Sequence, residues 1–115
     1  MARTCGILLF CVACAVSSGG ERANLALGKP YTMTRPSYRL CTDADDKTQL
    51  TDGVTTKGYF WTQKSTVGWG KGAPTFITID LGKVYPISGV SFGTAAGVAG
   101  VRWPTALMVF VSDDG

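Results

Sequence analysis

The clearest pattern in this chain is the alternation of apolar and polar side chains between residues 75 and 82. Ile77, Ile79 and Leu81 point to one side of an extended backbone, whereas Thr78 and Asp80 point to the other. A period of two is typical of a β-strand with one apolar face, and a glycine directly after the run ends it. The pattern therefore predicts a strand over residues 75–81.

Four other runs have strand character, and none of the intervening stretches has the periodicity of an amphipathic helix. These runs are residues 31–34, 59–63, 87–94 and 105–112. The sequence therefore predicts an all-β sandwich whose function lies in the loops between strands. The loops in question are residues 35–47, 64–71 and 95–103.

The run over residues 105–112 differs from the others because both of its faces are apolar. Leu107, Val109 and Val111 share one face, and Met108 and Phe110 share the other. A strand of this kind is expected to be covered on both sides, by other strands or by loops. The Ser-Asp-Asp-Gly sequence that follows is a hairpin-turn signal without a return strand, so we expect the natural domain to continue with further strands.

Residues 1–20 have the pattern of a secretory signal peptide. Arg3 supplies a minimal positive region, an apolar run covers residues 6–16, and four small residues follow. The run is too short to span a bilayer as a stable helix. We therefore expect a secreted chain, extracellular or periplasmic, cleaved between residues 18 and 23. The alternative is that residues 1–20 form a buried N-terminal strand or helix.

Three of the four cysteines lie inside this predicted leader. Cys11 and Cys14 have the spacing of a redox or zinc pair, but they would be discarded with the leader. Cys14 also ends a faint lipoprotein box, which makes lipid anchoring there a minor alternative. Cys41 is then the only cysteine of the mature domain, residues 21–115, so we expect its stability to come from the core rather than from a disulfide.

Composition and charge narrow the function classes. The chain has 115 residues, which suits one small domain, and a net charge of +3 without a Lys/Arg cluster. Nucleic-acid binding therefore has little electrostatic support. The chain has no histidine, which removes the usual general base, so we do not expect an enzyme. The acidic group Asp43, Asp45 and Asp46 is interpreted as a turn-forming loop, although paired carboxylates for glycoside hydrolysis remain an alternative.

Several segments, taken in order, resemble the discoidin or coagulation factor 5/8 type C family of galactose-binding-like domains. They are residues 24–30, 50–53, 59–61, 77–83, 87–90 and 109–115. The resemblance implies a jelly-roll β-sandwich, incomplete here because the family's strands after the Asp-Asp-Gly turn are absent. It also implies a non-catalytic module that binds a glycan or polysaccharide. The alternatives are an adhesion domain that binds protein or lipid, and an N-terminal accessory domain of a larger secreted carbohydrate-active enzyme.

The resemblance further implies a structural calcium ion near residues 50–56. Asp52 matches the family's carboxylate ligand, Gln49 stands where a side-chain oxygen is often found, and Val54 offers a backbone carbonyl. Calcium takes six to eight oxygen ligands, which a turn can supply. The alternative is that Asp52 and Gly53 only cap a turn.

Sugar recognition needs an aromatic ring against the C–H face of the sugar and a few fixed polar groups. The candidate ligand contacts on the matching loops are Tyr38, Arg39, Trp69, Arg102 and Trp103. Trp69, between glycines, is the best candidate for an exposed platform, whereas Trp103, before a proline and a strand, is interpreted first as structural. Trp61 is expected to pack in the core. The histidine that many sugar-binding relatives use is absent, so galactose is not indicated.

Overall fold

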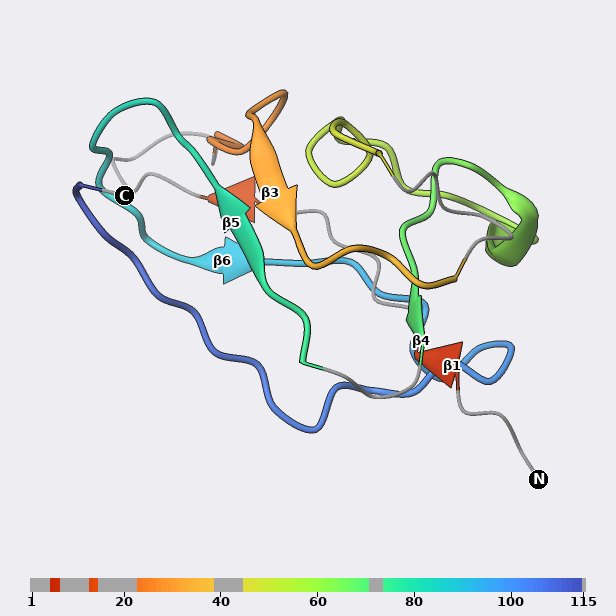
Figure 1. Cartoon of the computed structure of the whole chain (residues 1–115). Helices are drawn as coiled ribbons and strands as arrows, with labels where there is room; N and C mark the ends of the chain where they lie inside the picture. Colours follow the sequence, from red (N-terminus) through yellow and green to blue (C-terminus); the bar gives the residue numbers. More distant parts are fainter. Residues whose placement is uncertain (1–4, 7–12, 15–22, 39–44, 71–73, 115) are drawn as a thin grey trace.

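The computed structural model describes residues 5–6, 13–14, 23–38, 45–70 and 74–114 (Figure 1). Its regular elements are short and are, in chain order, β1 (Cys5–Gly6), β2 (Ala13–Cys14), β3 (Tyr31–Met33), the 3-10 helix η1 (Phe60–Thr62), β4 (Trp69–Gly70), β5 (Ile77–Ile79) and β6 (Val90–Ser91). All three strand pairings are antiparallel: β1 with β4, β2 with β6, and β3 with β5. The described chain is thus mostly non-helical with a few antiparallel strands, which agrees with the all-β expectation.

The longest ladder joins β3 to β5. Tyr31 lies opposite Ile79, and Met33 lies opposite Ile77. Two further bonds extend the ladder at its ends, from the Thr34 amide to the Phe76 carbonyl at 2.9 Å and from the Asp80 amide to the Pro30 carbonyl at 3.0 Å. Isoleucines on β5 are half-buried and the intervening threonine is exposed, which confirms the predicted alternation.

The main core lies beneath this ladder. Tyr31, Leu50, Val67 and Trp69 form its buried cluster, and three partly buried side chains of β3 and β5 pack against it, namely Met33, Ile77 and Ile79. A second cluster joins Phe60 to Val101, and the half-buried residues around it are Tyr38, Trp61, Ala95 and Ala96. Trp61 therefore packs as expected.

The strand predicted over residues 59–63 is wrong, because the chain turns there. Gly58 has a φ of +73°, and the Tyr59 carbonyl accepts both the amide of Thr62 at 3.1 Å and its hydroxyl at 2.9 Å. These local bonds close a 3-10 turn, η1, in place of a ladder. Phe60 consequently points inward and is buried, whereas Tyr59 is exposed.

The predicted strand over residues 87–94 is reduced to the two residues of β6. The run over residues 105–112 forms no strand at all, and every residue in it is exposed. The expectation that this run is covered on both sides is therefore wrong for the part of the chain that the structure describes. Among the described residues no strand pairs with this run, and its apolar side chains remain exposed to water.

Strands β1 and β2 fall inside the predicted leader. Their backbones pair with Trp69–Gly70 and with Val90–Ser91. Cleavage between residues 18 and 23 would remove both strands and open these two short edges. The signal peptide stays a prediction, and in the described residues no helix has the length and apolar character needed to cross a membrane.

Candidate functional site

Two regions hold the residues singled out above: a polar turn over residues 45–54, and a group of loops around the second core cluster. In Figure 1, η1 and the loop of residues 95–101 lie at the same end of the molecule, near β4. The polar turn lies beside the start of β3.

Asp46 organises the polar turn. Its Oδ1 accepts the amides of Thr48 at 3.1 Å and Gln49 at 3.0 Å, and its Oδ2 accepts the hydroxyl of Tyr31. The same tyrosine oxygen accepts the amide of Leu50 at 3.3 Å. Burial, followed by the hydrogen bond to the Asp46 carboxylate, raises the pKa of Tyr31 well above its ordinary value. The protonated phenol therefore clamps the turn onto the core.

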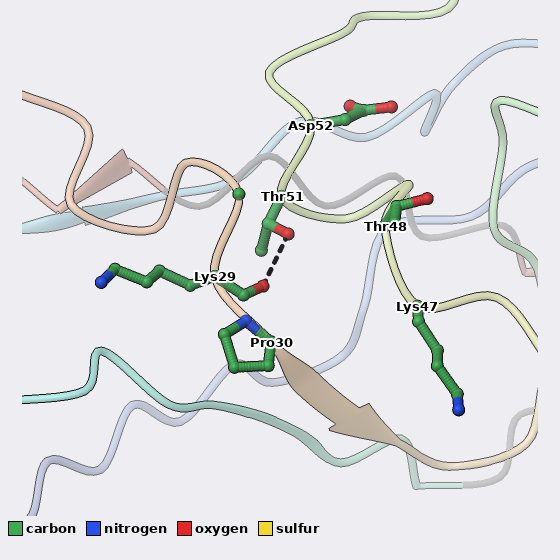
Figure 2. A pocket seen from close by; sticks show the side chains of 7 residues that line it. Lys29, Pro30, Lys47, Thr48, Thr51 and Asp52 are labelled. Carbon is green, nitrogen blue, oxygen red and sulfur yellow. Dashed lines mark hydrogen bonds between the residues drawn. The ribbon is translucent and has the colours of Figure 1, made fainter.

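Thr51 fastens the end of this turn to the segment before β3. Its hydroxyl donates to the Lys29 carbonyl at 2.9 Å (Figure 2), and its own carbonyl accepts the Gly28 amide at 2.7 Å. Between these segments lies a cavity of about 390 Å³. Its walls are formed by Gly28, Lys29, Pro30, Lys47, Thr48, Thr51 and Asp52. Figure 2 shows the Lys29 and Lys47 side chains pointing away from one another. The two ammonium groups therefore do not converge on one anion.

Asp52 and Gly53 form a capped turn. Asp52 Oδ1 accepts the Val54 amide at 2.8 Å, and Gly53 has a φ of +76°, which favours glycine. A Cβ at position 53 would lie 2.9 Å from Leu27 Cδ1. The turn-capping role weighed for Asp52 is therefore confirmed.

The calcium ligands implied by the resemblance lie on this same turn. Gln49 Oε1 is buried and accepts no hydrogen bond, while the Asp52 carboxylate is exposed and has one oxygen in the turn. These oxygens suit a hard cation, so the donor chemistry fits. Among the described residues, no three or more acidic, cysteine or histidine side chains come together as a metal group. A cation here would therefore depend on carbonyl and amide oxygens around one carboxylate.

The exposed platform predicted at Trp69 is wrong. Trp69 lies on β4 with 7% of its surface exposed, and its Nε1 donates to the Thr34 carbonyl at 2.6 Å. The ring fills the main core between Leu50 and Val67. The flanking glycines suggested an exposed loop, but Trp69 lies on a strand that packs against the main core.

Trp103 shows the opposite outcome. Interpreted first as structural, it is 68% exposed, and its neighbour Arg102 is exposed as well. The preceding residue, Val101, is buried against Phe60. The chain is thus anchored immediately before the two candidate contact residues.

The loop of residues 95–101 is closed by its own backbone. Gly97 donates to the Val101 carbonyl at 2.9 Å, and Val98 and Val101 donate to the carbonyls of Ala95 and Val98 at 3.1 and 3.0 Å. Val98, at the turn, is 56% exposed. The loop therefore presents one apolar side chain and leads into Arg102 and Trp103 from a fixed point.

The other candidates are placed differently. Tyr38 is half-buried against the second core cluster, and its amide donates to the Gly68 carbonyl at 3.1 Å, so it contributes to the loop's packing. Arg39 lies outside the described residues, as do Cys41 and Asp43. Sequence reasoning missed Tyr59, which is 70% exposed and contacts Trp61 edge to face with ring centroids 5.2 Å apart. Its position directly after Gly58 was the available signal for a turn.

A second cavity, of about 360 Å³, opens beside β3 in the region of the predicted loop 35–47. It is lined by Tyr31, Thr32, Met33, Arg35, Pro36, Asp45, Asp46 and Lys47. Its wall combines apolar and oppositely charged groups, which suits a polar ligand with an apolar face.

Comparison of the chain with family models, with curated proteins and with solved structures finds no match.

Proposed function

We propose that this chain is a secreted, non-catalytic carbohydrate-binding module with a discoidin-like jelly-roll fold. The observation that supports it most is the exposed ring of Trp103, which follows a loop anchored by the buried Val101. A flat ring held in this way can stack on the C–H face of a sugar, and the adjacent Arg102 can donate to hydroxyl or carboxylate groups.

Non-catalytic binding is proposed because the sequence lacks histidine, the most common general base. Asp45 and Asp46 serve a turn in which Asp46 is committed to two amides and a phenol. Hydrolysis of a glycoside needs two carboxyl groups that face one bond. If the chain is instead an accessory domain of a larger carbohydrate-active enzyme, catalysis resides in other parts of that protein.

The test is a glycan array followed by calorimetric titration of the best ligand. Trp103→Ala is expected to weaken binding about tenfold or more, as truncation of an aromatic anchor does. Phe76→Ala is the matched control, because Phe76 is also 73% exposed but lies beside β5, away from these loops. Absence of binding across plant, algal and animal glycans contradicts the proposal, and so does an equal loss in both variants.

A protein- or lipid-binding adhesion domain is the second candidate, and the exposure of Val98 favours it. Val98 and Trp103 place two apolar side chains around one loop, beside the cation Arg102. Such a group can insert into the interfacial region of an anionic membrane. Binding to phosphatidylserine vesicles that Val98→Asp abolishes, with glycan binding absent, would replace the first proposal by this one.

We also propose a structural calcium ion at the polar turn, held by Gln49, Asp52 and a carbonyl of Val54. The buried, unpartnered Gln49 Oε1 supports this, because an uncompensated amide oxygen is costly and a cation would satisfy it. Calcium at about a hundred times its dissociation constant is expected to stabilise the fold by about 2.7 kcal/mol. Asp52→Asn should remove this gain, whereas Asp113→Asn should keep it. Thermal unfolding that calcium leaves unchanged contradicts the site.

Secretion is proposed on the pattern of residues 1–20. Expression in a secreting host should release a chain whose first residue lies between 19 and 24, as measured by intact mass. Retention of residues 1–20 on the released chain would favour the alternative, in which β1 and β2 remain paired with β4 and β6.

A further inference from the structure

The largest unexplained feature of the described residues is the apolar segment, which we define as Leu107, Met108, Val109, Phe110 and Val111. The exposed fractions of these side chains run from 46% at Leu107 to 86% at Phe110. Five consecutive apolar residues exposed to this degree are unusual in a soluble protein and mark an interaction surface or an aggregation hazard. Figure 1 shows residues 104–114 running along one border of the molecule, with β5 and β6 on one side only.

The backbone of this segment is as free as its side chains. No hydrogen bond among the described residues involves the amide or carbonyl groups of residues 105–111. A row of unpaired amides and carbonyls on an extended chain is a template for a further strand. The segment is also rich in residues with high β-propensity and carries no charge. Its occupant should therefore be an extended, apolar peptide.

The charges at the two ends of the apolar segment indicate which extended peptide would pair with it. Arg102 precedes the apolar segment, and Asp113 and Asp114 follow it. Two parallel copies would set Asp beside Asp, which is repulsive, whereas two antiparallel copies set the cationic end of each against the anionic end of the other. The segment is thus complementary to itself in one direction only.

We propose that the apolar segment is a self-association strand, which pairs antiparallel with the same segment of a second copy of this chain. A register centred on Met108 sets Arg102 opposite Asp114 in both symmetry-related positions. It also sets Ala106 opposite Phe110, so that the smallest side chain faces the largest. An interface of this type is isologous and closes as a dimer.

The area available sets the strength of this dimer. Two segments that cover their apolar side chains and one backbone edge bury on the order of 1,000 Å² in total, at the lower limit of specific interfaces. The dimer should therefore form at micromolar concentration rather than nanomolar. Arg102 has two proposed roles, since it faces Asp114 in the dimer and contacts the glycan. Dimerisation and glycan binding are therefore measured in separate experiments, so that a change in one is not taken for a change in the other.

Sedimentation velocity of the full chain between about 1 and 100 µM tests the proposal, with circular dichroism as the check on folding. We expect a monomer–dimer equilibrium in this range. Phe110→Lys should yield monomer only, and the control Phe76→Lys, at another largely exposed phenylalanine outside the segment, should leave the dimer unchanged. A monomer at every concentration overturns the proposal, as does a broad series of larger species or an equal effect of both variants.

The charge pair tests direction and register. Arg102→Asp replaces two attractive contacts by two repulsive ones and should raise the dimer dissociation constant about tenfold. The double variant with Arg102→Asp and Asp114→Arg should restore it. Failure of the double variant to recover rules out the antiparallel register, whichever glycan result the chain gives.

Discussion

Strand β5 and the apolar segment are both predicted as strands from their sequences, yet only β5 forms one. On β5 each isoleucine is half-buried and paired with β3, while Thr78 between them is exposed. In the apolar segment all five side chains are exposed, and none of the strands in the described part of the chain pairs with it. A strand with one polar face is satisfied by a single layer beneath it, whereas a strand that is apolar on both faces needs two. In the described residues β5 packs against the main core cluster, whereas the side chains of the apolar segment are left exposed on both faces.

The largest contrast is expected between a tryptophan under the ladder and a phenylalanine on the apolar segment. Trp69→Ala removes a buried ring and its hydrogen bond to Thr34, and should cost about 3–5 kcal/mol in the free energy of unfolding. Phe110→Ala should change it by less than about 0.5 kcal/mol, because its ring is in water. Urea denaturation at protein concentrations below the dimer range measures the free energy of unfolding of both variants. Equal losses in the two variants would contradict the difference in burial between the two regions.

The Tyr31 hydroxyl gives the next effect. Tyr31→Phe leaves the Leu50 amide without its acceptor and removes the hydroxyl that donates to Asp46 Oδ2, at a cost of about 1–3 kcal/mol in the free energy of unfolding. Exposed Tyr59→Phe is the control and should cost little.

The same phenol predicts a pH dependence. Because the folded state raises the pKa of Tyr31 above that of the unfolded chain, the folded state holds its proton when the unfolded chain has lost it. The contribution of Tyr31 to stability should therefore be fully present below about pH 9 and be lost progressively as the pH rises past about 10, the ordinary tyrosine value. The fall should be shallower in Tyr31→Phe than in Tyr59→Phe. Parallel pH curves for the two variants would contradict the clamp.

Gly53 offers a smaller effect with a matched partner. Gly53→Ala and Gly58→Ala both place a Cβ on a left-handed backbone, with φ of +76° and +73°, at a cost of about 1 kcal/mol each. Only the Cβ at position 53 meets another atom, Leu27 Cδ1 at 2.9 Å. Since Leu27 is largely exposed and can move, the extra loss should be only about 0.5 kcal/mol in thermal unfolding. A larger loss of stability in Gly58→Ala than in Gly53→Ala would show that the steric contact with Leu27 does not determine which substitution costs more.

Amide exchange compares the two regions without any substitution. In dilute solution the amides of residues 107–111 should exchange at nearly the rate of an unfolded chain, whereas the Thr34 and Asp80 amides, which extend the β3–β5 ladder, should be protected. Raising the concentration into the dimer range should slow exchange in alternate residues of 107–111 only. Uniform protection at low concentration would show that the segment is already paired.

Local sequence patterns were sufficient to predict the structure wherever neighbouring residues alone determine it. The alternation at residues 77–81 predicted the half-buried isoleucines of β5, and the Asp-Gly pair predicted the turn that Asp52 caps through the Val54 amide. Packing of Trp61 was expected from its place on a predicted strand and from the family resemblance, and Trp61 does pack against the second core cluster although the strand is replaced by a turn. The 3-10 turn at η1 was not, because three consecutive aromatic residues suit a strand equally well, and Gly58 decides between the two only through its backbone conformation.

Only the tertiary structure decided which aromatic side chains are exposed to solvent. Trp69, between two glycines, was expected on an exposed loop, and Trp103, before a proline, was first interpreted as structural, yet Trp69 packs in the core and Trp103 is exposed. Burial depends on which distant segments pack over a residue, here residues 31, 50 and 67 over position 69, and no local pattern contains that information. The sequence alone determined that the chain is mostly β, that Asp52 and Gly53 form a turn, and that no histidine is present. The long-range packing determined where a partner can reach the surface.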